Sequence, residues 1–423
     1  MNINSRTKHR ILLILITLFF AALLWAAVSG VFYTAEAAEV GKLYVRITAD
    51  GREYVYKSPD IEYVGGIDKA LQEGFERDFR GRLTKQIKPL QCSYRLRGAA
   101  DKLSAIAKDF YKEPQDARII FSPDSRVMFD ITPDIKGREL DIAVMLKAID
   151  RALSAGHSFD AEAQAKSISA RHTYASLKRS TGQRQEFYTS FPASTPERKH
   201  NIALSLSKIN GTVLAPGEEF SFNRTVGQRT EARGFKEAKI ILGGEFVEGT
   251  GGGVCQASTT LYNAALLAGL KISEQHRHSL SVSYIKPSFD AMVNSGTADL
   301  KFVNDSGNFV FIKAFTKGDT AVVRIYGEKN PYKIVRKSLI TKTHIPPRER
   351  VITDTEGKYP NIYQGMRKIV QYSKPKLESV GMLQYYRLDG SLAFEKTIRK
   401  DVYGELAGLE VIGTAPPPHT PPE

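Results

Sequence analysis

Apolar residues recur at helix and strand spacings in the first folded part of the chain. Spacings of i, i+3, i+4 and i+7 predict an amphipathic helix over Asp101–Tyr111, and similar patterns predict helices over Ile67–Arg82 and Asp141–Leu153. Runs with a period of two predict three short strands, at Lys42–Ile47, Ala117–Phe121 and Val127–Ile131, of which the last two form a hairpin. These elements predict a small α+β domain over residues 35–180.

Two regions with different patterns follow. Residues 187–327 combine short strands, turns rich in glycine and proline, a helix over Arg198–Leu206 and a second helix that ends near Gly269. Residues 331–413 alternate strand-like runs with turns, which predicts an all-β module, and residues 414–423 form a proline-rich tail. The fold class predicted is therefore multi-domain α+β, with a mixed α+β domain at residues 187–327.

The N-terminal residues carry an uncharged apolar run. Ile11–Tyr33 has 23 residues without a charge, preceded by Arg6, Lys8 and Arg10. A helix of that length crosses a hydrocarbon core of about 30 Å, and the basic flank favours the cytoplasmic side. We therefore expect residues 1–34 to be a cytoplasmic tail and a single-pass anchor in the cell membrane, with the rest extracytoplasmic. A signal peptide cleaved near Ala35–Ala37 is the alternative.

Charge and cysteine content limit the binding partners and the disulfides that we expect. The net charge is +14, but no arginine-rich tract or aromatic RNA-binding signature accompanies it, so we predict no nucleic-acid partner. Outside a membrane, a basic protein meets anionic wall polymers and lipid head groups instead. The two cysteines, Cys92 and Cys255, fall in different predicted domains and make no disulfide framework.

The stretch Gly249–Asn263 concentrates the candidate chemistry. Three consecutive glycines lead into a helix that carries Cys255 on its first turn. There the unpaired N–H groups and the helix dipole favour thiolate over thiol. The glycines could supply N–H groups for an oxyanion. We assign substrate binding to the residues that line this end or share the helix face of the thiol: Gly252, Gly253, Gln256, Ser258, Thr259 and Tyr262.

A histidine follows the helix at a suitable place in the sequence. Residues 279–285 alternate like a strand, and His278 has the parity of the residues that face the core. A thiol on a helix start followed by such a histidine is the order used by papain-like, NlpC-type and transglutaminase-like enzymes. Asp290, Asn294 and Asp299 are candidates to orient the imidazole, and we choose Asp290 only because it lies within a block, Asp290–Ala291, that resembles a known family. The predicted catalytic set is thus Cys255, His278 and Asp290.

Several sequence blocks carry a family resemblance. From about Phe187 to Gly327 the chain resembles the VanW family, through the blocks Leu214–Asn223, Gly234–Ala238, Gly251–Gln256, Ser258–Ala265, His278–Leu280 and Asp290–Ala291. Gly137–Asp141 resembles the peptidoglycan-binding domain found beside L,D-transpeptidase and VanW domains, and the last module resembles the G-five domain. The resemblance implies a cell-envelope protein linked to glycopeptide resistance, with peptidoglycan as its partner, and no cofactor.

Two functions remain open at this point. The first is a thiol amidase, peptidase or transpeptidase that acts on stem peptides of peptidoglycan, and the second is a non-catalytic wall-binding or scaffolding protein. Cys255 could also be a buried, inert thiol. A zinc site made by Cys255, His276 and His278 is a further alternative, although no fourth ligand is evident.

Overall fold

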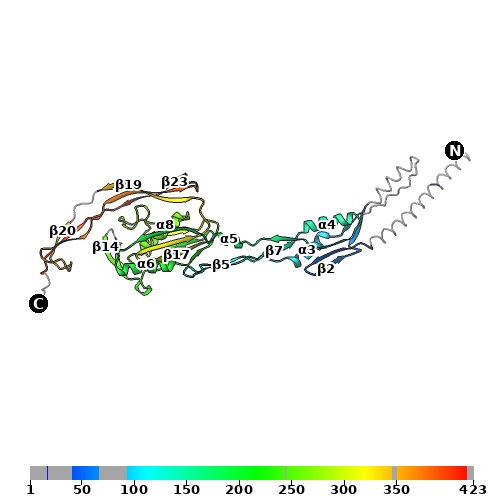
Figure 1. Ribbon diagram of the computed structural model, residues 1–423, viewed down its shortest axis with the longest axis horizontal. Helices are drawn as coiled ribbons and strands as arrows, with labels where there is room; N and C mark the ends of the chain where they lie inside the picture. Colours follow the sequence, from blue (N-terminus) through cyan, green and yellow to red (C-terminus); the bar gives the residue numbers. More distant parts are fainter. Residues whose placement is uncertain (1–16, 18–40, 66–92, 243–244, 345–349, 417–423) are drawn as a thin grey trace, which may run out of the picture. The chain divides into compact units, whose positions relative to one another are not determined.

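The computed structural model describes residue 17 and residues 41–65, 93–242, 245–344 and 350–416 (Figure 1). They form two compact units. The N-terminal unit contains residues up to 116 and residues 134–171, and the C-terminal unit contains residues 117–133 and everything from residue 172 onward. The predicted anchor, except for Thr17, lies outside the described residues, as do Cys92 and the predicted helix Ile67–Arg82. Within the described residues, no helix combines the length and apolar character needed to span a bilayer.

The N-terminal unit packs two helices against short sheets. Its core combines alternate residues of β1 with the apolar faces of α3 and α4, including Val45, Ile47, Leu103 and Ile149. Asp141 accepts the Val144 N–H at 3.1 Å and caps α4. Its elements are β1 (Val45–Ala49), β2 (Arg52–Tyr56), β3 (Ile61–Gly65), β4 (Ser93–Leu96), α3 (Ala99–Phe110), β7 (Gly137–Leu140), α4 (Ile142–Ser154), β8 (Phe159–Glu162) and β9 (Ala165–Ile168). The predicted strand near residue 45 and the helices near residues 101 and 141 are confirmed.

The C-terminal unit centres on the antiparallel sheet β10-β18-β17-β11. The first half of the unit comprises β5 (Arg118–Phe121), β6 (Phe129–Thr132), α5 (Tyr174–Arg179), β10 (Gln183–Ser190), α6 (Pro196–Ile209), β11 (Thr212–Leu214), β12 (Glu219–Ser221), α7 (Phe222–Val226), η1 (Glu231–Arg233), β13 (Glu237–Leu242), β14 (Glu245–Thr250), α8 (Val254–Leu267), β15 (Lys271–Glu274), β16 (Lys301–Val303), β17 (Val310–Thr316) and β18 (Thr320–Tyr326). Helices α6 and α8 pack on the sheet, α6 against β17 and α8 against β10 and β18.

The sheet is apolar on both faces, and a different element covers each. Ile312 and Ile325 belong to the core shared with the two helices. Phe311 and Tyr326, which alternate with them, meet the rings of Phe121 and Phe129 from the hairpin β5–β6 at centroid distances of 5.1–6.4 Å. The predicted hairpin is thus confirmed, and it packs within the C-terminal unit.

The last part of the chain, residues 331–413, is a C-terminal β module of the same unit. Its strands are β19 (Lys333–His344), β20 (Arg350–Asp354), β21 (Arg367–Gln371), β22 (Lys376–Tyr386), β23 (Leu392–Tyr403) and β24 (Leu409–Gly413), in the sheets β19-β22-β23 and β20-β24-β21. Ile334 and Leu383 are buried in the core that contains α8, so this module shares a hydrophobic core with the preceding domain. The predicted limits of the individual domains stay predictions.

Candidate active site

The glycine run brings the chain sharply into α8. Gly251 and Gly253 have φ values of 92° and 106°, which residues with a Cβ rarely adopt. A Cβ on Gly252 would lie 2.7 Å from the carbonyl oxygens of Ala238 and Lys239 in β13. The run therefore allows both a left-handed turn and close packing against the neighbouring hairpin, and it delivers Cys255 to the first turn of the helix.

Cys255 is a half-buried free thiol whose side chain forms a hydrogen bond with His278. Its Sγ lies 3.3 Å from the carbonyl oxygen of Val293. Burial alone would raise the pKa of the Cys255 thiol, but the hydrogen bond and the positive charge of His278, together with the charge of Arg229, outweigh burial and lower that pKa. The electrostatics of the site thus favour the thiolate form of Cys255.

His278 is buried and fixed by Asp290. Asp290 Oδ2 accepts from both the Nδ1 and the main-chain N of His278, each at 2.7 Å. Because Nδ1 is engaged, Nε2 is left to interact with Cys255. Burial opposes protonation of the ring, but the contacts with Asp290 and Cys255 prevail and raise the pKa of His278 to about 9. This pKa favours a protonated imidazole at neutral pH, placed between the Cys255 sulfur and the Asp290 carboxylate.

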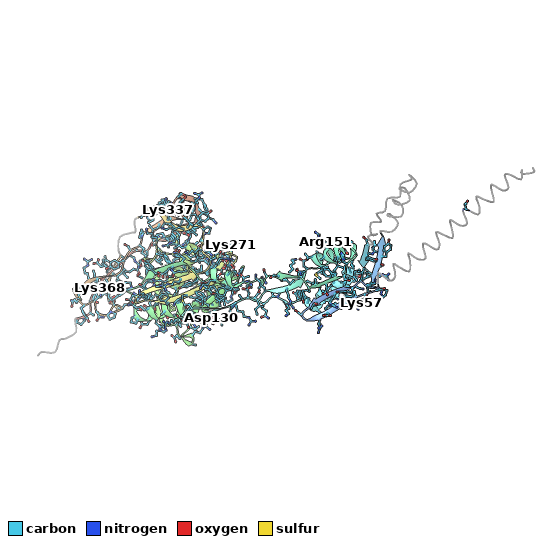
Figure 2. The ribbon with its side chains drawn as sticks, turned by 45° about the vertical axis from the view of Figure 1, so that its right-hand side comes forward. Lys57, Asp130, Arg151, Lys271, Lys337 and Lys368 are labelled. Atoms are coloured by element: carbon cyan, nitrogen blue, oxygen red, sulfur yellow. The ribbon has the colours of Figure 1, made fainter. Side chains whose placement is uncertain are left out.

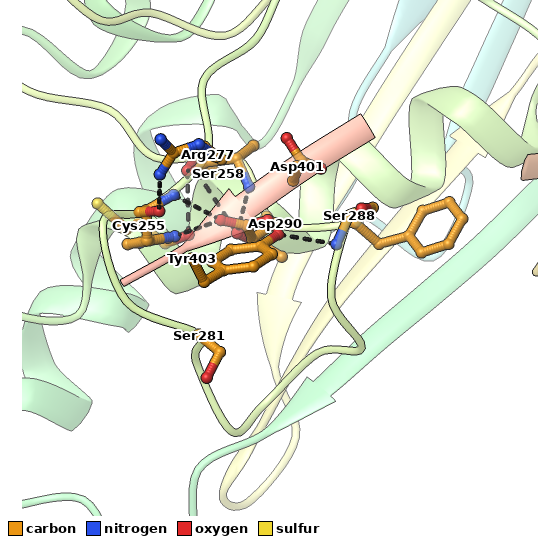
Figure 3. Close-up of polar contacts among 12 residues, drawn as sticks. Cys255, Ser258, Arg277, Ser281, Ser288, Asp290, Asp401 and Tyr403 are labelled. Carbon is orange, nitrogen blue, oxygen red and sulfur yellow. Dashed lines mark hydrogen bonds and ion pairs between the residues drawn. The ribbon is translucent and has the colours of Figure 1, made fainter. Parts of the chain in front are cut away.

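Asp290 is held in turn by strand β23 of the C-terminal β module (Figure 3). The Tyr403 hydroxyl donates to Asp290 Oδ1 at 2.6 Å, and Arg399 Nη1 donates to the main-chain oxygen of Asp290 at 2.7 Å. Arg399 also pairs with Asp401 at 2.6 Å. Burial would raise the pKa of Asp290, but His278, Arg399 and Tyr403 hold it below its usual value. The C-terminal β module therefore completes the site.

The loop before Asp290 is locked by the same module. Ser288, which is fully buried, has a φ of 65°, a conformation that residues with a side chain seldom adopt. Its N–H donates to the Tyr403 hydroxyl at 2.8 Å, and its hydroxyl lies 2.7 Å from that of Ser379. These contacts fix the backbone that presents Asp290 to the imidazole.

Two arginines add positive charge near the sulfur. The charge of Cys255 acts on both Arg198 and Arg229, although burial is the larger effect and lowers the pKa of each. Arg198 donates to Gln256 Oε1 at 2.8 Å, and Arg229 donates to Asn223 Oδ1 at 2.5 Å. These guanidinium groups increase the preference of the site for anions, including a thiolate.

The structural element that positions His278 differs from the predicted one. The expected strand over residues 279–285 is wrong, because the segment is a loop with a single bridge from Leu280 to Gly404. His278 is positioned instead by its own main-chain bond to Asp290 and by the Met292 N–H, which donates to the oxygen of His276 at 2.8 Å. Of the alternating residues, Leu280 is buried and Tyr284 forms a hydrogen bond with Thr259 of α8.

The other candidates for orienting the ring have different roles. Asn294 Oδ1 accepts three main-chain N–H groups of its own turn, at residues 296–298. Asp299 accepts from Ser221 Oγ at 2.6 Å and from the Asn223 N–H at 2.8 Å. His276 of the zinc alternative pairs with Glu274 at 2.9 Å, and the described part of the chain contains no metal-binding group of three or more His, Cys, Asp or Glu side chains.

The residues assigned to substrate binding are largely enclosed. Side chains of Gln256, Ser258, Thr259 and Tyr262 are all nearly or fully buried. Ser258 Oγ donates to the Ala291 oxygen at 2.5 Å, and Thr259 Oγ1 accepts the Ala291 N–H at 2.9 Å. The loop around Asp290 lies on the polar face of the helix, and its backbone forms hydrogen bonds with the hydroxyl groups there.

The main-chain donors of the glycine run are partly used as well. The N–H of Val254 bonds to the Gly251 oxygen, and that of Gln256 bonds to the Gly253 oxygen at 2.9 Å. Gly252 is buried against β13, while Gly253 is half-buried. Substrate binding by any of the six predicted residues stays a prediction.

Sequence reasoning missed Arg198, Arg399, Asp401 and Tyr403. One signal for the last three was present: they alternate along a strand-like run, so they share one face of it. Three polar groups on a single strand face indicate a polar interface. Their target, more than 100 residues earlier in the chain, carried no matching signal.

Comparison with known families agrees with this architecture. Residues 197–326 match the family described as "VanW like protein", and residues 54–161 match the family described as "Putative peptidoglycan binding domain". The chain therefore carries a VanW-family domain and a domain of the peptidoglycan-binding family, as the sequence blocks predicted. Together, these two domains indicate a cell-wall-associated protein.

Two curated proteins are similar to parts of the chain. The uncharacterized protein YoaR of Bacillus subtilis is 40% identical over 167 residues, 40% of this chain and 55% of that protein. The vancomycin B-type resistance protein VanW of Enterococcus faecalis is 28% identical over 148 residues, 33% of this chain and 54% of that protein. The chain thus spans about half the length of these relatives.

Among the solved structures that match is that of HP0197-G5, which is 11% identical and is covered completely by 20% of this chain, with a TM-score of 0.11. A score that low carries no argument about fold. The G-five-like character of the C-terminal β module accordingly stays a prediction.

Proposed function

We propose that the C-terminal unit is a cysteine-dependent enzyme that acts on amide bonds in the stem peptides of peptidoglycan. The observation that carries the proposal is the buried chain of contacts from Cys255 through His278 to Asp290. A thiolate, an imidazolium and a carboxylate in that order make a nucleophile, a general acid and the group that orients it.

The chemistry follows from the protonation states. The Cys255 thiolate attacks the amide carbonyl and forms a C–S bond, while His278 transfers its proton to the leaving amine as the C–N bond breaks. Neutral His278 then takes a proton from water or from an amine that attacks the thioester. Water gives hydrolysis, and an amine gives a new amide bond, so the same site supports amidase, peptidase or transpeptidase activity. In both cases Cys255 returns as thiolate and His278 as imidazolium.

Attachment to the wall is the role we propose for the N-terminal unit and for the basic surface. Lys57 and Arg151 in the N-terminal unit, and Lys271 and Lys368 in the C-terminal unit, are exposed (Figure 2). With a net charge of +14, such side chains attract anionic wall polymers. We further propose that Ile11–Tyr33 retains the protein in the cell membrane with the two units outside, and that its activity contributes to glycopeptide resistance.

The second candidate function is non-catalytic wall binding or scaffolding. One observation favours it: the polar face of α8 that could receive a substrate is buried beneath the loop around Asp290. In this alternative Cys255 and His278 stabilise the fold, and recognition belongs to the peptidoglycan-binding domain.

The two candidates differ in what they require of the thiol. In the full chain at neutral pH, Cys255 should react with iodoacetamide much faster than Cys92, because its lowered pKa increases the fraction of thiolate. Cys255→Ala should abolish the release of new products from purified peptidoglycan, followed by mass spectrometry. The matched control is Cys92→Ala, which removes the other cysteine of the chain and should leave products unchanged. Slow labelling of both thiols, or full activity of Cys255→Ala, would defeat the catalytic proposal.

A further inference from the structure

Beside the candidate active site lies a hollow of about 600 Å³. Phe187, Tyr188, Ile285 and Pro287 contribute apolar and aromatic surface to it, and its lining also includes Ser283, Tyr284, Lys286 and Arg336. Tyr188 is 62% exposed, so the hollow is open to solvent along that side. A site with aromatic walls and a few charged groups is the usual form of a small-ligand pocket.

Tyr284 connects this hollow with the catalytic residues. It lines the hollow, and its side chain also hydrogen bonds to Thr259 of α8. Burial, followed by the negative charges of Cys255 and Asp290, raises the pKa of Tyr284 well above its ordinary value. A molecule in the hollow would therefore lie on the other side of one tyrosine from the thiol.

Arg336 supplies an uncompensated positive charge to the hollow. Its guanidinium lies 4.3 Å from the ring centre of Phe187 and 4.9 Å from that of Phe289, and it donates to the side-chain oxygen of Asn263. No carboxylate of the described residues pairs with it. Burial lowers the pKa of Arg336 to about 10, since the neutral partner Asn263 does little to offset desolvation.

An arginine held in this way is prepared for an anion. The two rings fix the plane of the guanidinium, and a planar guanidinium binds a carboxylate through two parallel hydrogen bonds. Neutralising a partly buried charge also removes the penalty of leaving it unpaired. Lys286 is exposed, lines the hollow and adds a second positive charge.

We propose that this hollow, which Arg336 lines, binds the free C-terminal carboxylate of a short peptide beside the candidate active site. The apolar walls would hold the small side chain beside that carboxylate, and Lys286 would attract it. This assignment rests on the proposed function for the class of substrate, because a stem peptide provides both an amide carbonyl and a terminal carboxylate. The binding step itself does not depend on catalysis.

The experiment measures binding in the full chain carrying Cys255→Ala, so that no turnover interferes. Calorimetry compares N-acetyl-alanyl-alanine as the free acid with its C-terminal amide, using both alanine stereoisomers. We expect the better stereoisomer of the acid to bind about tenfold to a hundredfold more tightly than its amide, the range of a charge-assisted hydrogen bond. Arg336→Gln should remove that preference, and Arg336→Lys should restore only part of it.

Two variants control for charge and for folding. Lys337→Gln removes the same charge from the next position of β19, which is exposed and points to the other face of the strand, and it should leave the affinity unchanged. Should Arg336→Gln unfold the protein, Lys286→Gln at the exposed rim is expected to weaken the acid several-fold without affecting the amide.

Three results would overturn the subsite. They are equal affinity for acid and amide, equal weakening by Lys337→Gln and Arg336→Gln, and tighter binding of glycerol phosphate than of the peptide acid. The last result would assign the hollow to a phosphate polymer instead. Failure of the catalytic proposal has a different signature, because it leaves acid binding intact while Cys255 shows neither fast alkylation nor turnover.

Discussion

Replacing Tyr403 by phenylalanine tests whether the C-terminal β module controls the chemistry of Cys255. The Tyr403 hydroxyl donates to Asp290 at 2.6 Å and accepts the Ser288 N–H at 2.8 Å. A hydrogen bond to a charged group contributes about 1.5–3 kcal/mol, and an N–H left buried without a partner costs about 1–3 kcal/mol. We therefore expect Tyr403→Phe to lower the free energy of unfolding by about 2.5–6 kcal/mol.

The same change alters the charge balance of the site. The Tyr403 hydrogen bond is one of the contacts that hold the pKa of Asp290 low against its burial, so its loss raises that pKa. The carboxylate of Asp290 then stabilises the protonated imidazole of His278 less, so the pKa of His278 falls from about 9. Because His278 is less often charged, the pKa of Cys255 rises. One pKa unit corresponds to about 1.4 kcal/mol, so loss of this hydrogen bond shifts the pKa of Asp290 by at most about one to two units.

The assay follows the rate of alkylation of Cys255 by iodoacetamide as a function of pH, in a Cys92→Ala background. Tyr403→Phe should move the inflection of the thiol to higher pH. Tyr386→Phe is the matched control, because it removes a hydroxyl of the same module that lies 3.3 Å from Gln384. If Tyr403→Phe destabilises the fold but leaves the inflection where it was, the tyrosine is only structural and the reasoning fails.

Two further predictions concern stability. Gly252→Ala should lower the free energy of unfolding by about 1–3 kcal/mol, because its Cβ would lie 2.7 Å from two carbonyl oxygens. Chemical denaturation measures this change. The control is Gly296→Ala, which should leave the stability unchanged because a Cβ at that position would meet no other atom within 4 Å. His278 has its pKa raised from 6.5 to about 9, so its contribution to stability is complete below pH 6.5 and is lost as pH rises through about 9. The midpoint of urea unfolding should therefore decrease as the pH rises across that interval, and the decrease should be smaller in His278→Gln. An equal decrease in that variant would contradict the assigned pKa.

Local patterns were sufficient to predict the elements that carry the site. The helix α8 follows from the glycines and the apolar positions after Cys255, and two amphipathic helices of the N-terminal unit follow from spacing alone. Periodicity reports on neighbours within a few residues. It therefore located the thiol at the start of a helix.

Contacts between distant segments were harder to predict. Alternation at residues 279–285 suggested a strand, although the segment is a loop with a single bridge, from Leu280 to Gly404. Sequence gives no register between segments more than 100 residues apart, so the role of Tyr403 was invisible. For the same reason, Ser258 and Thr259 were assigned to substrate binding, whereas their hydroxyl groups are hydrogen-bonded to the backbone of Ala291.

The hairpin β5–β6 has a consequence for how the protein divides. The chain passes from one unit to the other at residues 116–117, 133–134 and 171–172. A single proteolytic cut or gene fusion point after residue 171 would leave the hairpin with the wrong partner. The freed C-terminal unit would then expose Phe311 and Tyr326, which are buried under it in the intact protein. Exchanging one unit for that of a homologue therefore requires two junctions more than a simple tandem arrangement would.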